Sequence, residues 1–316
     1  MSSPRRPRHF GAQRTEIATS GAAAATVASL ERQPGADVLK GRLFKGALLV
    51  GVALALGGLV WLIVDALIEG GGRLSLSLIF DRGSADPEKA GLWSAILGSV
   101  YLMIGVIAAV VPLGVGAAIY LEEYANRERW WNRLIELNIQ NLAGVPSIVY
   151  GILGLAFIVR GPLDLGFILF AGSMTVALLV LPTVILAARE AIRAVPSSIR
   201  EGSLALGATK WQTIRRQILP ASVPGIVTGV ILAVSRAIGE TAPLLLVGAT
   251  VFVTFDPSFF DDKGYTVLPV QIFQWVQRPQ DEFRVLAAAG IIVLLGLLLA
   301  MNSFAIWLRN RYEQRW

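Results

Sequence analysis

Residues 196–220 read PSSIREGSLALGATKWQTIRRQILP, and this polar segment contains two separate helix signals. Residues 198–201 and 209–212 each have a Ser or Thr followed three residues later by Glu or Gln, a pair that caps helix starts. Gly207 suits the left-handed turn that ends many helices. The segment therefore predicts two short helices joined at a glycine, with Pro220 ending the second.

Long apolar runs lie on both sides of this segment and recur along the chain. A helix needs about 20 apolar residues to cross about 30 Å of hydrocarbon. The chain is 54% hydrophobic and only 16% charged, whereas soluble domains carry about 25% charged residues. These values exclude an ordinary water-soluble enzyme and predict an all-α integral membrane protein. We expect six spans, at 44–68, 92–119, 139–159, 165–188, 221–253 and 285–308.

Charge sets the expected orientation of these spans. Most of the 28 Lys and Arg residues fall in segments that share one side if the N-terminus is inside, namely 1–43, 120–138, 189–220 and 309–316. Loops rich in Lys and Arg stay in the cytoplasm. We therefore expect a multi-pass protein of the plasma (inner) membrane with both termini cytoplasmic. The basic excess is a topology signal, so lipid is an expected partner and nucleic acid is not.

The composition also limits the chemistry. The chain has no Cys, and its one His is His9 in the polar N-terminal stretch. No metal site and no Ser-His-Asp triad can be assembled in the spans from these residues. The phosphate-binding pattern G-x-x-x-x-G-K-[ST] is absent, so we expect no nucleotide to bind this chain. The sequence predicts no catalytic residue, no metal ligand and no cofactor, and hence no enzyme.

A charged pair lies inside the predicted span 221–253. Arg236 and Glu240 are four residues apart, on one helical face, and Gly239 and Pro243 weaken the helix around them. Charged residues inside membranes are costly and usually functional. Arg236 either pairs with Glu240 to lock helix packing or faces a water-filled path and meets an anion, with Thr241 beside it. Arginine suits phosphate-like oxygens because its planar fork matches them.

The predicted span 139–159 offers weaker candidates for the same path. Asn141 and Ser147 carry polar side chains, and Pro146 frees a backbone carbonyl. The alternative is a kinked helix that only packs against its neighbours.

Two segments complete the predicted organisation. Residues 1–43 are rich in Arg, Ala, Ser and Pro and predict a disordered basic cytoplasmic tail ahead of a transmembrane domain at 44–316. The outer segment 254–284 predicts a loop followed by a short interfacial helix at 268–276, with Phe273 and Trp275 at headgroup level.

The cytoplasmic loop resembles the signature of bacterial ABC importer permeases. That signature runs E-A-A, three residues, G, nine residues, I, one residue, L-P, and here residues 201–220 match its spacing, with Gly202, Ser203 and Gln217 as departures. The resemblance implies that the loop docks on a cytoplasmic ATPase subunit. It carries this role to Glu201, Ala205, Leu206, Gly207, Ala208, Thr209, Lys210 and Trp211.

The residues around the charged pair show a more specific resemblance, to one group within these permeases. Residues 236–246, RAIGETAPLLL, are similar to the hallmark of PstA-type permeases of phosphate importers, as are PLGVGAAIYLEEY at 112–124 and NLAGVPSIVYG at 141–151. It implies the six-helix, MetI-like, type I importer fold. It also implies a PstC-type second permease, an ATPase dimer that binds ATP and Mg, and an external phosphate-binding protein.

Two alternatives remain at this point. Sulfate or molybdate could replace phosphate, because one arginine does not distinguish tetrahedral oxyanions. An ion-coupled secondary transporter for anions would transport alone and show repeated halves with broken helices, and the sequence shows no convincing internal repeat.

Overall fold

The computed structural model describes residues 35–126, 128–249 and 253–312. The chain divides into two compact units, Met1–Val64 and Asp65–Trp316. Most of the predicted tail, residues 1–34, lies outside the described residues. Helix α2 (Gly35–Gly70) begins within the rest of the predicted tail, so residues 35–43 are helical.

In the first unit the described residues belong to α2 alone. Its apolar side chains, including Leu54 and Trp61, are exposed along the helix. A helix with an apolar surface on all sides is suited to lipid or to another membrane protein. This helix corresponds to the first predicted span.

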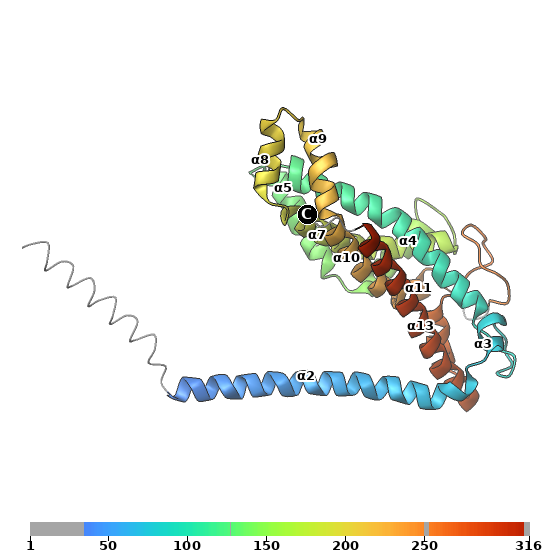
Figure 1. Ribbon diagram of the computed structural model, residues 1–316. Coiled ribbons are helices and arrows are strands. Elements are labelled where there is room, and N and C mark those ends of the chain that lie inside the picture. The colour runs from blue at the N-terminus through green and yellow to red at the C-terminus, as the bar shows by residue number, and fades with distance from the viewer. Residues whose placement is uncertain (1–34, 127, 250–252, 313–316) are drawn as a thin grey trace, which may run out of the picture. The chain divides into compact units, whose positions relative to one another are not determined.

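The regular elements among the described residues of the second unit are all helices, joined by loops, and an isolated bridge links Ala249 and Tyr265. The longer helices are labelled in Figure 1, and short helical segments of the 3-10 or π type are named η in the text. After α2 the elements are η1 (Gly71–Arg73), α3 (Leu76–Phe80), α4 (Trp93–Ile119), η2 (Tyr120–Tyr124), α5 (Trp130–Ala143), α6 (Ser147–Leu153), η3 (Gly154–Val159), α7 (Leu169–Arg193), α8 (Ser197–Ala205), α9 (Lys210–Thr213), η4 (Ile214–Ile218), α10 (Leu219–Ile238), α11 (Ala242–Leu246), α12 (Leu268–Val276) and α13 (Asp281–Tyr312).

Five helices among the described residues are long and apolar enough to cross a membrane, and a bent pair would make six. The bent pair is α5 with α6–η3, which meet at 108°. The predicted span 139–159 is therefore not one continuous helix, because its residues divide between two arms that meet at a sharp bend. Pro146 has no N–H to donate to the carbonyl of Leu142, so the helix breaks there. The Tyr150 hydroxyl donates to that carbonyl instead, at 3.0 Å.

The predicted span 221–253 also differs from the structure. The helix that contains it starts earlier, because α9, η4 and α10 run on as one helix, Lys210–Ile238. Pro220 therefore does not end the second loop helix. It lies in the first turn of α10, directly after the π turn η4, where its missing N–H is tolerated. The helix ends at Ile238 and restarts as α11, which confirms the predicted break between Gly239 and Pro243.

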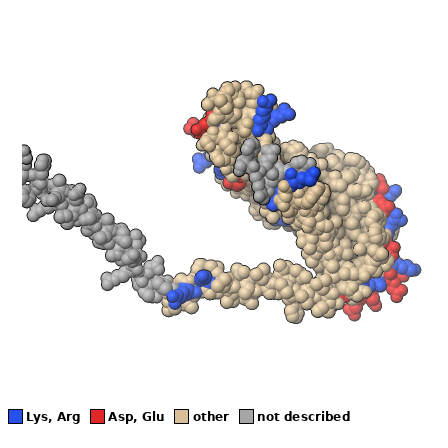
Figure 2. All heavy atoms as spheres, in the orientation of Figure 1, with Lys and Arg blue, Asp and Glu red and all other residues tan. Residues whose placement is uncertain are grey.

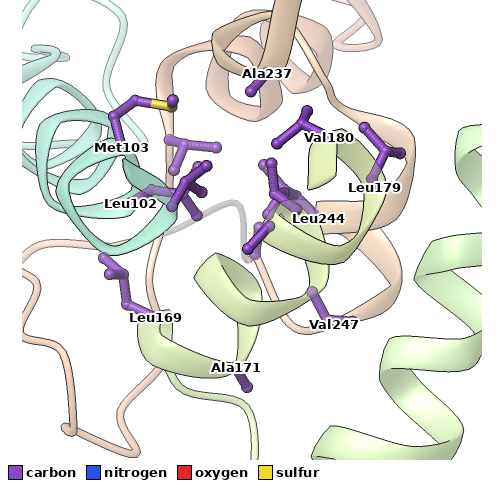
Figure 3. Close-up of a cluster of buried hydrophobic side chains, with 14 of the residues drawn as sticks. Leu102, Met103, Leu169, Ala171, Leu179, Val180, Ala237, Leu244 and Val247 are labelled. Atoms are coloured by element: carbon purple, nitrogen blue, oxygen red, sulfur yellow. The ribbon is translucent and has the colours of Figure 1, made fainter. Parts of the chain in front are cut away.

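The core of the second unit forms where α4 and α10 pack against α7, with α11 added beside α7. Side chains from all four helices meet in one buried cluster (Figure 3). Leu102 and Met103 come from α4, Val180 from α7, Ala237 from α10 and Leu244 from α11. Because Ala237 belongs to this cluster, the helix end that carries Arg236 is fixed to the core.

α3 and the segment that leads to α12 lie at the end of the second unit opposite α8 and α9 (Figure 1). The predicted helix 268–276 is confirmed as α12. Trp275 is buried against Phe283, however, and so is not an exposed anchor at the membrane surface, whereas Phe273 is exposed. On the face in view, charged residues gather near both ends of this unit with mostly uncharged residues between them (Figure 2). Such an arrangement suits a protein that crosses a bilayer.

Candidate translocation site and cytoplasmic loop

The charged pair lies at the break between α10 and α11. α10 ends with a tightened turn in which Gly239 and Glu240 donate their N–H groups to the carbonyls of Arg236 and Ala237, at 3.1 and 3.2 Å. Thr241 then precedes α11, and its hydroxyl is 3.5 Å from the carbonyl of Gly239. The break follows from Gly239, which ends helices easily, and from Pro243, which fits a helix start.

Arg236 and Glu240 contact each other at this break. Nε of Arg236 is 3.5 Å from Oε1 of Glu240, and the two side chains are 61% and 15% exposed, respectively. The carboxylate is thus held in place while the guanidinium projects from the surface of the chain. Arg236 also lies in the last turn of α10, where the helix dipole favours a cation. The arrangement presents a tethered positive charge with unused donors, which could receive an anion.

The other predicted pathway residues lie on neighbouring elements. Ser147 begins α6, and α6 packs against α11 so closely that a Cβ on Gly151 would come within 2.7 Å of Cα of Pro243. Asn141 is exposed near the end of α5, on the other arm of the bend. The structure therefore joins Arg236 directly to Glu240 and places Ser147 on the helix beside α11. Asn141 stays one element further away in the chain.

Two polar contacts near this site were not predicted from the sequence. The Ser235 hydroxyl lies 2.6 Å from Oδ1 of Asn302, which joins α10 to α13 next to Arg236. Tyr150 closes the bend between α5 and α6, as described above. The signal for Tyr150 was present, because it follows Pro146 by four residues and the freed carbonyl precedes Pro146 by four. Asn302 offered only an isolated polar residue in an apolar helix.

The loop that the sequence predicts to be cytoplasmic forms a protruding helical pair, α8 and α9 (Figure 1). Gly207 has φ +83° just after α8, which confirms the predicted left-handed turn. The Thr209 capping box is present, with Thr209 and Gln212 each bonding the other's backbone. The predicted capping box at Ser198 is wrong, because α8 already begins at Ser197, with Pro196 as its N-cap and no side-chain capping bond.

The predicted docking residues lie at the tip of this pair. Glu201, Ala205, Gly207, Thr209, Lys210 and Trp211 are exposed, Leu206 is 91% exposed, and Ala208 is half-buried. Beside the tip, a groove of about 420 Å³ runs between the helices; Ile199, Gly202, Leu206 and Gln212 are among its lining residues. An exposed leucine next to an open groove is suited to contact with another protein.

Comparison with known proteins places these features in a family. Residues 110–314 match the family described as "Binding-protein-dependent transport system inner membrane component". The chain belongs to this family. Its members are transport components rather than enzymes, and the charged pair and the cytoplasmic loop both lie within the matched region of this permease.

Individual relatives agree with this assignment. The permease is 36% identical over 267 residues to the phosphate transport system permease protein PstA of Yersinia pestis, covering 82% of this chain and 87% of the relative. It is 37% identical over 229 residues to PstA of Mycobacterium leprae, covering 71% and 72%.

Two solved structures share the fold of this permease. The methionine ABC transporter MetNI, in inward-facing conformations, aligns with a TM-score of 0.56 at 16% identity, covering 71% of this chain and 95% of that one. A bacterial alginate ABC transporter aligns with a TM-score of 0.58 at 15% identity, covering 85% and 94%. The expected importer-permease fold, with several membrane-spanning helices, is confirmed. In the described part of the permease, no group of three or more His, Asp or Glu side chains gathers as a metal site would require.

Proposed function

We propose that this permease is the PstA-type subunit of an ATP-driven importer and passes inorganic phosphate across the inner membrane. The observation that carries the proposal is the exposed guanidinium of Arg236, held beside Glu240 where the helix breaks. The relatives named PstA support phosphate as the anion.

The site's electrostatics suit brief contact with an anion. An arginine facing hydrocarbon would cost at least about 2.5–3.5 kcal/mol, so its exposed side is suited to water or to a second permease. Its fork can bind two phosphate oxygens at once. Glu240 offsets part of its charge when no anion is present, which weakens binding enough for the anion to leave. A transport path needs this balance, since an anion held tightly would not move on.

In this proposal the cytoplasmic loop couples ATP hydrolysis by a partner subunit to movement of the permease. The chain lacks the phosphate-binding pattern of ATPases, so ATP and Mg would be bound by a partner ATPase dimer that receives the tip around Leu206 and Trp211. Closure of that dimer would move α8 and α9 and switch the path from inward- to outward-facing. Phosphate would then pass Arg236 and leave inward after reopening, without covalent chemistry on this chain.

The remaining partners follow from the same proposal. A PstC-type permease would form a heterodimer with this chain and cover the Arg236 face, and an external binding protein would deliver phosphate to the end that carries α3 and α12. Both termini would be cytoplasmic. The C-terminal end of α13 lies toward the same end of the second unit as α8 and α9, which supports this orientation (Figure 1).

Uptake of labelled phosphate by cells that lack this chain, with and without the restored gene, tests the proposal. We expect the gene to restore energy-dependent uptake that excess cold sulfate or molybdate does not compete. Competition by either anion would replace phosphate with another oxyanion. Uptake by the purified chain alone in liposomes, with no ATPase partner, would instead indicate an ion-coupled secondary transporter.

A further inference from the structure

Helix α8 has an unusual position in the cytoplasmic loop because none of its residues is buried. The second loop helix is different, since Ile214 and Ile218 of η4 are buried in a cluster with Ala118 of α4 and Ile192 of α7. Burial of apolar side chains therefore fixes the second helix onto the membrane helices. It cannot fix α8, whose position must be set by polar contacts.

Arg200 makes most of those polar contacts. Its guanidinium donates to the carbonyls of Ile192 and Val195, at 2.7 and 2.6 Å, where α7 ends. The same group donates to Oε1 of Glu123 at 3.0 Å. The planar guanidinium spreads its donors over three nitrogens and so reaches all three acceptors, whereas a lysine ammonium donates from a single nitrogen. One side chain thus joins α8 to the end of α7 and to the π turn η2.

The turn η2 is joined to the other parts of the loop base as well. Glu122 accepts two bonds from Arg193 of α7, at 3.0 and 3.1 Å, and lies 3.6 Å from Arg189. The side chains of Glu122 and Arg189 are each only 5% exposed. Partly buried carboxylate–guanidinium pairs resist separation, because either partner left alone would be an uncompensated charge.

Tyr124 completes the set of contacts on the opposite side of the turn. The ammonium of Lys210, in α9, lies 4.9 Å from the centre of the Tyr124 ring. Consecutive residues of η2 therefore contact α7, α8 and α9 in turn. Since η2 continues α4 without a gap, the contacts with α8 and α9 connect the loop to a membrane helix, and those with α7 join two membrane helices.

We infer that Arg200 and Glu123 are positioning residues that make α8 move as one body with α4, so that the ATPase subunit's push on the loop reaches the membrane helices through η2. This inference rests on the proposed function, because it needs the ATPase partner. α4 packs along α7, and α7 packs along α10, which carries Arg236. The contacts thus connect the loop to the candidate site through packed helices.

The test uses the complete transporter in proteoliposomes with the binding protein, and measures phosphate uptake and ATP hydrolysis together. We expect Glu123→Gln and Arg200→Lys to keep the ATPase subunits bound but to lower the phosphate moved per ATP several-fold. Arg215→Lys, on the exposed side of η4, is the matched control and should behave as the wild type. Unchanged coupling in both variants would overturn the inference.

A reversible cross-link separates positioning from simple loss of stability. The chain has no Cys, so Glu123→Cys with Arg200→Cys can be joined by a short reagent that a reductant releases. We expect the unlinked double variant to couple poorly and the linked one to recover. A linked form that is inactive until reduced would show that α8 must move relative to η2, which contradicts the inference. Failure of the wild-type transporter to take up phosphate would count against the proposed function instead.

Discussion

The Tyr150 hydroxyl bonds the carbonyl of Leu142, eight residues earlier, across the bend that Pro146 creates. Tyr150 is 7% exposed, so the bond lies in a largely dry environment. Backbone groups within a membrane protein need partners inside the protein, because lipid offers none. The proline and the tyrosine thus act together, one opening the helix and the other holding the opened ends.

Tyr150→Phe removes this bond and keeps the ring. We expect a loss of about 0.5–1.5 kcal/mol of stability, the usual net value of one hydrogen bond. The thermal midpoint of the purified protein in detergent should fall by a few degrees. Tyr120→Phe, at an exposed position, is the control and should leave the midpoint unchanged. An equal shift in both variants would contradict the structural role of the Tyr150 hydroxyl.

Gly207→Ala should disturb the tip of the cytoplasmic loop. Its φ of +83° is unfavourable for any residue with a Cβ, at a cost of roughly 1–2 kcal/mol. We expect weaker retention of the ATPase subunits during purification and lower uptake, with normal insertion of the chain in the membrane.

Gly202→Ala is the matched control for that change. Gly202 lies inside α8 and lines the groove beside the tip, but an added methyl group meets no neighbour within the chain, favours the helix and matches the alanine of the importer-permease signature at this position. Normal ATPase retention is expected for this variant. If Gly207→Ala also retains the ATPase subunits normally, the left-handed turn is not required for docking.

The ion pair between Arg82 and Asp256 should make stability depend on pH. Arg82 donates two bonds to Asp256, at 3.2 and 2.9 Å, and these bonds lower the pKa of the Asp256 carboxyl below its usual 3.8. A carboxyl whose pKa is lower in the folded protein stabilises the fold when the pH is above the pKa of that carboxyl in the unfolded chain. This stabilisation is lost as the pH falls through the pKa in the folded protein. Both groups are substantially exposed, so the effect is small.

Arg82→Gln should therefore lower the thermal midpoint slightly at pH 7, and the difference from wild type should shrink as the pH falls through the lowered pKa of Asp256, below which the carboxyl is protonated in both proteins. Lys89→Gln, which removes a more exposed lysine 3.7 Å from Asp86, is the comparison and should change the midpoint less. A difference that persists at low pH would mean that Arg82 acts through packing rather than charge.

Much of the fold could be predicted from the sequence because the determining features are local. Apolar run lengths predicted the spans, and the pattern at Thr209 and the glycine at 207 predicted the loop's turn correctly. The 108° bend was missed, since Pro146 alone does not distinguish a kink from a sharp reversal. The prediction that Pro220 ends the second loop helix was wrong, because the π turn before it allows a proline within a continuous helix.

The candidate site and the base of the loop were predictable only in part, because only some of their contacts join residues that are close in the sequence. Arg236 and Glu240 are four residues apart, so their contact followed from helix geometry. The contacts of Glu122 with Arg193 and of Glu123 with Arg200 join residues 71 and 77 positions apart, and nothing local predicts such partners. For Trp275 a local pattern was misleading. The sequence of its helix suggested a place at the membrane interface, but the ring packs against Phe283, a contact that the pattern does not reveal.

The measurement that most directly tests the account is phosphate uptake by cells carrying Arg236→Gln in place of the wild type, corrected for the amount of protein in the membrane. Arg215→Gln, which removes an exposed arginine outside the candidate site, serves as the control. The account predicts near-complete loss of uptake for Arg236→Gln and wild-type uptake for the control. Wild-type uptake by Arg236→Gln would contradict it and leave Arg236 as a packing charge.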